Sequence, residues 1–117
     1  DLLRLRASTR LFRLGTAERV RAMVSFPVSN SWHQLPGVVV MAISDPAAEV
    51  DPRWSGLLVV FNATPWLVRQ GLPFEVRGYE LHPVQAAGSD DLVRTCEVGG
   101  DWLSVPERTA AVFVRPR

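Results

Sequence analysis

The sequence predicts an all-β fold, an antiparallel β-sandwich of about eight short strands with a short N-terminal helical segment. Short apolar or alternating runs recur along the chain, and turn signals rich in Gly, Pro, Asn, Asp and Ser separate them. Between these runs no helical pattern of about 10–15 residues occurs, as a parallel βαβ arrangement would need. The 117 residues, 47% hydrophobic and 21% charged, suit one globular domain.

The most diagnostic run is Leu57 to Pro65, which reads Leu-Leu-Val-Val-Phe-Asn-Ala-Thr-Pro. Its short length, with Gly56 before it and Pro65 at its end, indicates a strand buried on both faces, and we take it as the central strand. Asn62-Ala63-Thr64 matches the N-glycosylation pattern. Because this triplet ends an apolar strand, a structural role is favoured, in which Asn62 and Thr64 close the strand by local hydrogen bonds.

A helical segment and two strands are expected before the central strand. Residues 1–7 interleave leucines with arginines, as an amphipathic helix does, and Thr16 suits the N-cap of one further turn. Val20 to Phe26 alternates with period two, which predicts a strand with one buried face. Val38 to Ser44 is a second continuous apolar run, and it predicts a strand like the central one.

Weaker strand signals follow the central strand. The expected strands are Trp66 to Arg69, Tyr79 to His82, Val93 to Val98, Trp102 to Val105 and Thr109 to Val114. Gly99-Gly100 predicts a hairpin turn between the third and fourth of these strands. Loops are expected at residues 27–37, 47–55 and 84–91, where small, polar and turn-forming residues gather.

Charge and cysteine content exclude several classes of function. The net charge of +1 argues against a general affinity for nucleic acid or for an anionic membrane. The single cysteine, Cys96, excludes an internal disulfide and a multi-cysteine metal site. No apolar run approaches the roughly 18 residues of a membrane span. We therefore expect neither a metal nor a cofactor.

Few residues could carry chemistry: His33, His82, Cys96, Glu49, Asp51, Asp90 and Asp91. The two histidines lie far apart in the chain, and neither has metal-ligand spacing to another His or Cys, so both are interpreted as structural or solvent-facing. The carboxylates form pairs in loops, where we expect solvated turn or cap residues. Cys96, on an alternating strand, is interpreted as a small buried hydrophobe. No catalytic residue is assigned.

The tryptophans are the first candidate binding feature, and all of them fall in or beside loops: Trp32, Trp54, Trp66 and Trp102. Exposed indole rings offer flat stacking faces for sugars or for a protein partner. Alternatively, each tryptophan caps one edge of the sandwich core, because Trp is usually largely buried.

An N-terminal basic group is the second candidate feature: Arg4, Arg6, Arg10, Arg13, Arg19 and Arg21. Asp1 and Glu18 alone oppose these charges within the segment. A solvated face accounts for such a group. The alternative is docking against an acidic neighbouring domain, in which the apolar part of the contact comes from Leu2, Leu3, Leu5, Leu11, Phe12 and Leu14.

Five blocks of sequence follow one another in a recognisable order: Leu11 to Glu18 (LFRLGTAE), Pro36 to Met41 (PGVVVM), Val59 to Pro65 (VVFNATP), Leu81 to Ala87 (LHPVQAA) and Val105 to Val114 (VPERTAAVFV). In this order they resemble the C-terminal domain of pullulanase-type α-1,6-glucosidases, which are debranching enzymes of the α-amylase clan. The resemblance extends over essentially the whole chain, and the departures from it fall mainly in the loops at 29–34 and 66–74.

The resemblance implies that the chain is a fragment of a longer glycoside hydrolase. In that family a (β/α)8 barrel carries the catalytic carboxylates that hydrolyse α-1,6 branch points of starch, glycogen or pullulan, and a β-sandwich follows and packs against the barrel. Residues 1–15 would then be the end of the last barrel helix and a connector, and residues 16–117 the C-terminal sandwich. Because the catalytic residues belong to the barrel, none transfers to this chain.

The resulting hypothesis is a non-catalytic β-sandwich that stabilises the catalytic barrel of its parent chain. A first alternative is a carbohydrate-binding module for α-glucans, with Trp32, Trp54, Trp66 and Trp102 as the stacking platform. A second alternative is a protein-interaction domain that uses the Leu/Arg-rich N-terminal segment.

Overall fold

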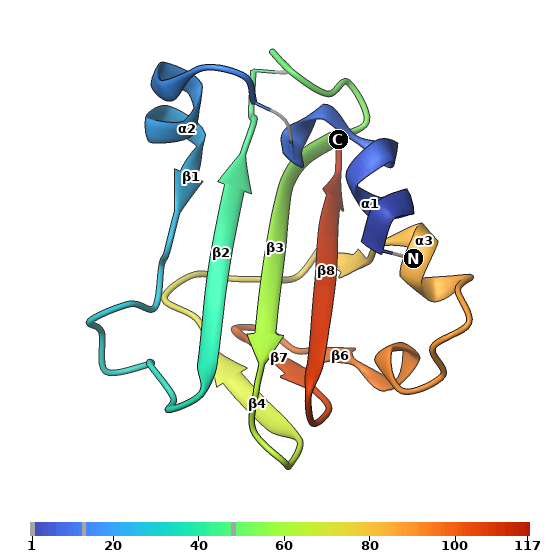
Figure 1. Ribbon diagram of the computed structural model, residues 1–117. Coiled ribbons are helices and arrows are strands. Elements are labelled where there is room, and N and C mark those ends of the chain that lie inside the picture. Colours follow the sequence, from blue (N-terminus) through green and yellow to red (C-terminus); the bar gives the residue numbers. More distant parts are fainter. Residues whose placement is uncertain (1, 13, 48) are drawn as a thin grey trace.

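Two antiparallel sheets pack face to face in the computed structural model, which describes residues 2–12, 14–47 and 49–117. The strands of the five-stranded sheet, in spatial order, are β1 (Val24–Ser25), β2 (Val38–Ser44), β3 (Trp54–Asn62), β8 (Thr109–Pro116) and β5 (Glu80–Leu81). Those of the three-stranded sheet are β4 (Val68–Gly71), β7 (Trp102–Val105) and β6 (Glu97–Val98). Figure 1 shows this smaller sheet behind the larger one. The predicted antiparallel β-sandwich is confirmed.

The predicted central strand is confirmed as β3, which lies in the middle of the five-stranded sheet. The run from Leu57 to Val60 is buried at every position because the two faces of β3 meet different cores. Leu58 and Val60 face the smaller sheet, and Leu57 and Val59 face the helices. The strand begins at Trp54, where a loop was expected, and its pairing with β8 is irregular between Trp54 and Gly56.

The inner core fills the space between the sheets. Its largest fully buried side chain is Phe113 of β8, which packs with aliphatic side chains from both sheets. Complete burial of a side chain of this size stabilises the fold by roughly 1.5–3 kcal/mol. The buried members of this core are Val28, Val38, Val40, Leu58, Val60, Val68, Leu72, Val76, Val93, Leu103, Val105, Ala111 and Phe113.

The outer core lies between the other face of the large sheet and the N-terminal segments. These segments are α1 (Leu2–Ser8), the 3-10 turn η1 (Arg10–Phe12) and α2 (Ala17–Met23). The buried members of the outer core are Leu5, Leu11, Leu14, Met23, Ile43, Leu57, Val59, Val112 and Val114. Three of the leucines that the sequence offered for docking, Leu5, Leu11 and Leu14, therefore contribute to the domain's own core.

The prediction of a strand at Val20 to Phe26 is wrong, because the expected single turn after Thr16 extends into helix α2 as far as Met23. The Thr16 cap itself is confirmed, since its hydroxyl accepts a hydrogen bond from the Arg19 N–H at 3.2 Å. The alternating pattern was misleading because it assigned Val20 to a buried face, whereas Val20 is 46% exposed. The side chain that anchors the helix is instead the buried Met23. Only β1 remains of the expected strand.

The loop expected at residues 84–91 begins instead with a short helix, α3 (Pro83–Ala86). The strand expected at 93–98 begins instead with a 3-10 turn, η2 (Val93–Thr95). Pro83 at the first helical position and His82 as N-cap explain α3. The predicted hairpin is confirmed as β6 and β7. The weaker strand expected at Trp66 to Arg69 is shifted to β4.

Candidate functional site

The candidate catalytic residues do not converge. His33 is half-buried in the β1–β2 loop, with its ring stacked on Trp32, whereas His82 is buried beside α1. Within the residues that the structure describes, no three or more His, Cys, Asp and Glu side chains form a group that could hold a metal ion. Of the helices in those ranges, none has the length and apolar character needed to cross a membrane.

Cys96 is half-buried and packs against the inner core, as expected of a small hydrophobe. Burial, together with the nearby charge of Asp90, raises the pKa of the Cys96 thiol to about 11. The thiol is therefore protonated at neutral pH, and a nucleophile or metal ligand would need the thiolate.

The loop carboxylates divide into two kinds. Glu49, Asp90 and Asp91 are exposed, as expected, and Asp90 accepts a hydrogen bond from the Leu92 N–H at 2.9 Å. Asp51 is 3% exposed, so the expectation that it is solvated is wrong. Its carboxylate accepts a hydrogen bond from the hydroxyl of Thr9, which lies between α1 and η1. This long-range contact explains the burial.

Asp51 also receives two donors from Arg53. The Arg53 backbone N–H lies 2.8 Å from Asp51 Oδ1, and the guanidinium forms an ion pair with the carboxylate at 3.3 Å. The same guanidinium donates to the backbone carbonyl of Ser8, at the end of α1. Burial alone would raise the pKa of Asp51, but the Thr9 hydroxyl and Arg53 outweigh burial and lower the pKa below its ordinary value.

Asp45, at the end of β2, is fully buried and accepts three backbone hydrogen bonds. They come from the N–H groups of Glu49, Val50 and Asp51, at 2.9, 3.0 and 2.9 Å. Arg117 adds an ion pair at 3.2 Å and also donates to the Asp45 carbonyl at 2.6 Å. Burial opposes ionisation, but these donors prevail and lower the pKa of Asp45.

His82 adds a further contact to the end of α1. Its Nδ1 accepts a hydrogen bond from the Val84 N–H at 3.1 Å, and its Nε2 lies 3.2 Å from the Ser8 hydroxyl. Because that hydroxyl donates to the Leu5 carbonyl at 2.7 Å, Nε2 is assigned as the donor to Ser8. Burial and the charge of Arg53 lower the pKa of His82, so the ring is neutral near pH 7.

We call this group the α1 junction; its members are Ser8, Thr9, Asp45, Asp51, Arg53, His82 and Arg117. It joins the end of α1 to the β2–β3 loop, to α3 and to the last residue of the chain. Sequence reasoning missed it because its members are 42 to 74 positions apart in the decisive contacts. The only local sequence signal of the junction is the presence of carboxylates, Asp45 and Asp51, close to the ends of predicted strands.

The tryptophans fall into two classes of exposure. Trp32 is 88% exposed and Trp66 65% exposed, so their rings are accessible. Trp54 and Trp102 are half-buried. The Arg69 guanidinium lies 4.2 Å from the centre of the Trp102 ring, and Gly99 packs so closely against that ring that no side chain would fit there.

The two accessible tryptophans come from two different loops. Trp32 belongs to the β1–β2 loop and stacks on His33, with ring centres 3.9 Å apart. Trp66 belongs to the β3–β4 turn, where its carbonyl accepts a hydrogen bond from Asn62 at 3.0 Å. The N-terminal basic group is exposed at Arg4, Arg6, Arg10, Arg19 and Arg21. The expected contributions of Asp1, Arg13 and the Leu2 side chain lie outside the described residues.

Comparison with solved structures identifies the same fold in larger enzymes. The apo pullulanase from Klebsiella pneumoniae matches 97% of this chain over 12% of its own, with a TM-score of 0.82 and 31% sequence identity. A pullulanase mutant from Paenibacillus barengoltzii, complexed with maltotriose, matches 99% of this chain over 16% of its own, with a TM-score of 0.73 and 28% identity.

Comparison by sequence leads to the same enzymes. Pullulanase 1, chloroplastic, from Arabidopsis thaliana is 38% identical over 126 residues, which cover 100% of this chain and 13% of the relative. Pullulanase from Klebsiella pneumoniae is 31% identical over 122 residues, which cover 100% of this chain and 11% of that protein. The chain thus spans a small part of these relatives. The family model for the C-terminal region of pullulanase-type alpha-1,6-glucosidases matches residues 1–116. The chain belongs to this family of pullulanase C-terminal domains.

Proposed function

We propose that this domain is the non-catalytic C-terminal β-sandwich of a starch-, glycogen- or pullulan-debranching α-1,6-glucosidase, and that it stabilises the catalytic (β/α)8 barrel of the same parent chain. Residues 1–15 are then the end of the last barrel helix and the connector, and residues 16–117 the sandwich. Membership of the family supports the assignment of the parent chain to this class of enzyme. The α1 junction is the observation that carries the stabilising role.

The α1 junction makes the entry of the chain into the sandwich rigid. Thr9 and Ser8, at the end of α1, are held by the buried Asp51 and His82. Leu5 is buried against the sheet from the same helix. A barrel that continues into α1 is therefore held next to a folded sandwich at a high effective concentration. Contacts made only between the folded barrel and the folded sandwich stabilise both against unfolding.

Removal of residues 16–117 from the parent enzyme is expected to shorten the half-life of pullulanase activity at elevated temperature at least about ten-fold, because the barrel loses its stabilising contacts. The measurement is residual pullulan hydrolysis after timed heating, with kcat/KM of the unheated enzyme as the control for the active site. Equal half-lives of the full and shortened enzymes would contradict the stabilising role. Pullulan hydrolysis that co-purifies with the folded 117-residue chain alone would contradict the non-catalytic assignment.

Binding of α-glucan is a second candidate, favoured by the exposure of two indole rings. Trp32 is 88% exposed, and its stacking on His33 orients the indole, while Trp66 is 65% exposed. Aromatic rings held in this way provide apolar faces on which the pyranose rings of a sugar chain could stack. Trp54 and Trp102 are half-buried and make other contacts, so they contribute less to this candidate.

Under this candidate, Trp32→Ala is expected to weaken maltooligosaccharide binding by the 117-residue chain at least about five-fold, since one stacking face is removed. The measurement is the change in tryptophan fluorescence during titration, confirmed by affinity electrophoresis in soluble starch. Phe74→Ala, which removes a different aromatic ring that is 38% exposed, is the matched control. A flat titration of the unmodified chain would eliminate glucan binding.

A further inference from the structure

The outward face of the large sheet carries three rows of apolar side chains across β2, β3 and β8. The first row is Ile43, Leu57 and Val114, the second is Met41, Val59 and Val112, and the third is Val39, Phe61 and Ala110. The outward positions of a sheet in a sandwich are ordinarily polar, because they face water. Here all three rows are apolar, which is typical of a sheet face that other elements cover along its whole length.

The domain's own helices cover this face only in part. The first row is fully buried, and members of the second are buried or half-buried. In the third row, however, Val39 is 48% and Phe61 46% exposed, although they are paired neighbours on adjacent strands. The surface at Phe61 and Val39 is therefore an apolar area without a covering element among the described residues.

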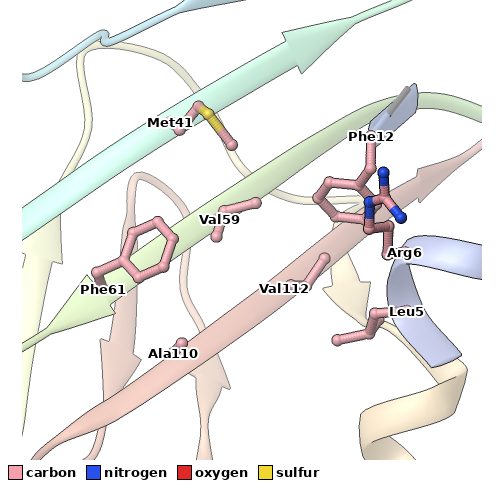
Figure 2. Close-up of a pocket in the computed structure, with 8 residues that line it drawn as sticks. All are labelled: Leu5, Arg6, Phe12, Met41, Val59, Phe61, Ala110 and Val112. Atoms are coloured by element: carbon pink, nitrogen blue, oxygen red, sulfur yellow. The ribbon is translucent and has the colours of Figure 1, made fainter. Parts of the chain in front are cut away.

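A groove of about 270 Å³ runs from this exposed row to the N-terminal segment. Figure 2 shows Phe61 and Ala110 at one end of the groove and Arg6 and Phe12 at the other. The lining is almost entirely apolar; its members are Leu5, Arg6, Phe12, Met41, Val59, Phe61, Ala110 and Val112. A groove of this kind accepts apolar side chains from a partner.

The groove is basic at its α1 end. Arg6, which lines it, is exposed, as are Arg4 and Arg10 in the same N-terminal segment, and neither α1 nor η1 contains an acidic residue. Electrostatic complementarity therefore favours a partner surface that surrounds its apolar contacts with carboxylates.

We infer that the third row and the groove form the docking face for the domain that precedes residue 1 in the parent chain. This inference rests on the proposed function and assigns its contact surface. The chain enters the sandwich through α1, and Leu5 and Arg6 of α1 line the groove. The preceding domain is therefore tethered beside the exposed apolar area at Val39 and Phe61. The family is C-terminal, and this chain spans 11–13% of its curated relatives, so the relatives have a large preceding region.

The docking face can be tested by cysteine labelling in the full-length parent enzyme. Phe61→Cys reports on the docking face, and Leu67→Cys is the matched control, because Leu67 is 56% exposed but precedes β4 in the other sheet. Each variant is treated with a maleimide, and labelling of the peptide that contains the new cysteine is followed by mass spectrometry. We expect the cysteine at 61 to react at least about ten-fold more slowly than the cysteine at 67 in the native enzyme, and equally fast in urea.

Equal labelling rates at the two positions in the native parent enzyme would overturn the assignment of the face. Protection at 61 that also occurs in the 117-residue chain alone and increases with its concentration would overturn it too, because a second copy would then be the occupant. Val39→Cys gives an independent measurement from β2 if the variant at 61 is poorly folded.

The result is separable from the proposed stabilising role. If removal of the sandwich shortens the half-life of the enzyme while the cysteine at 61 labels freely, the stabilising role stands and this face is wrong. If the cysteine at 61 is protected while removal leaves the half-life unchanged, the face is correct and the stabilising role is wrong.

Discussion

Asn62→Ala is expected to lower the free energy of unfolding by about 3 kcal/mol, because it removes the buried amide that holds the turn after β3. Asn62 is 2% exposed at the end of β3. Its Nδ2 lies 2.9 Å from the Pro106 carbonyl, 3.1 Å from that of Val105 and 3.0 Å from that of Trp66. Its Oδ1 accepts the Thr64 N–H at 3.0 Å. Alanine would remove the amide from these groups at a buried position, and among the described residues only the Trp66 carbonyl has a second side-chain donor, the Thr64 hydroxyl.

Urea denaturation of the 117-residue chain, followed by circular dichroism, measures this loss. Asn30→Gly is the matched control, since Asn30 is exposed and its positive φ of 61° is a conformation that glycine adopts freely. We expect the control to change stability by less than about 0.5 kcal/mol. A loss below about 1 kcal/mol for Asn62→Ala would show that water replaces the lost bonds.

Asp45→Ala is expected to destabilise the domain at pH 7 by about 3 kcal/mol, because it leaves three buried N–H groups without their acceptor and removes the carboxylate that pairs with Arg117. Asp45 is fully buried, and among the described residues the Arg117 guanidinium would keep only backbone carbonyls as acceptors. Asp91→Ala is the control, because Asp91 and Arg94 form an ion pair on the surface and such pairs contribute about 0–1 kcal/mol.

The effect of Asp45→Ala is also expected to depend on pH. The pKa of Asp45 is lowered in the folded state from 3.8, so its contribution is complete well above that value and is lost as pH falls through 3.8 toward the folded pKa. Urea titrations at pH 7 and near pH 3 should therefore show a smaller difference between the two proteins in acid. The pKa of His82 is also lowered in the folded state, so protonation of His82 destabilises both proteins below its unfolded pKa of 6.5. This effect is the same in both proteins and cancels in their difference. A difference that does not change with pH would contradict an ionised Asp45.

The strands of the inner core could be predicted because their sequence pattern is local. The run from Val38 to Ser44 and the run from Leu57 to Val60 are apolar on both faces, and each became a strand of the large sheet. The expected role of Asn62 and Thr64 in closing the strand is also confirmed by their hydrogen bonds. In these segments the local signal and the tertiary environment favour the same structure.

Segments whose structure depends on distant partners could not be predicted in this way. In α2 the alternation of Val20 with Ala22 favoured a strand, but the cap at Thr16 and the burial of Met23 on the sheet favoured a helix. The α1 junction was missed for a related reason. Asp51 resembles any loop carboxylate until Thr9, 42 positions away, is placed beside it. The exposed third row was hidden because a continuous apolar run does not show which face is left uncovered.

The last strand of the chain, β8, lies inside the large sheet, paired with β3 on one side and β5 on the other. During translation residues 109–116 therefore leave the ribosome after both of their neighbours. Until they emerge, β3 presents an unpaired apolar edge that can associate with other nascent chains. A premature stop codon before residue 109 would thus abolish the whole sandwich rather than one strand, and quality-control proteases would degrade the product. The order of the strands in the sheet makes folding of this domain depend on complete synthesis of residues 109–116.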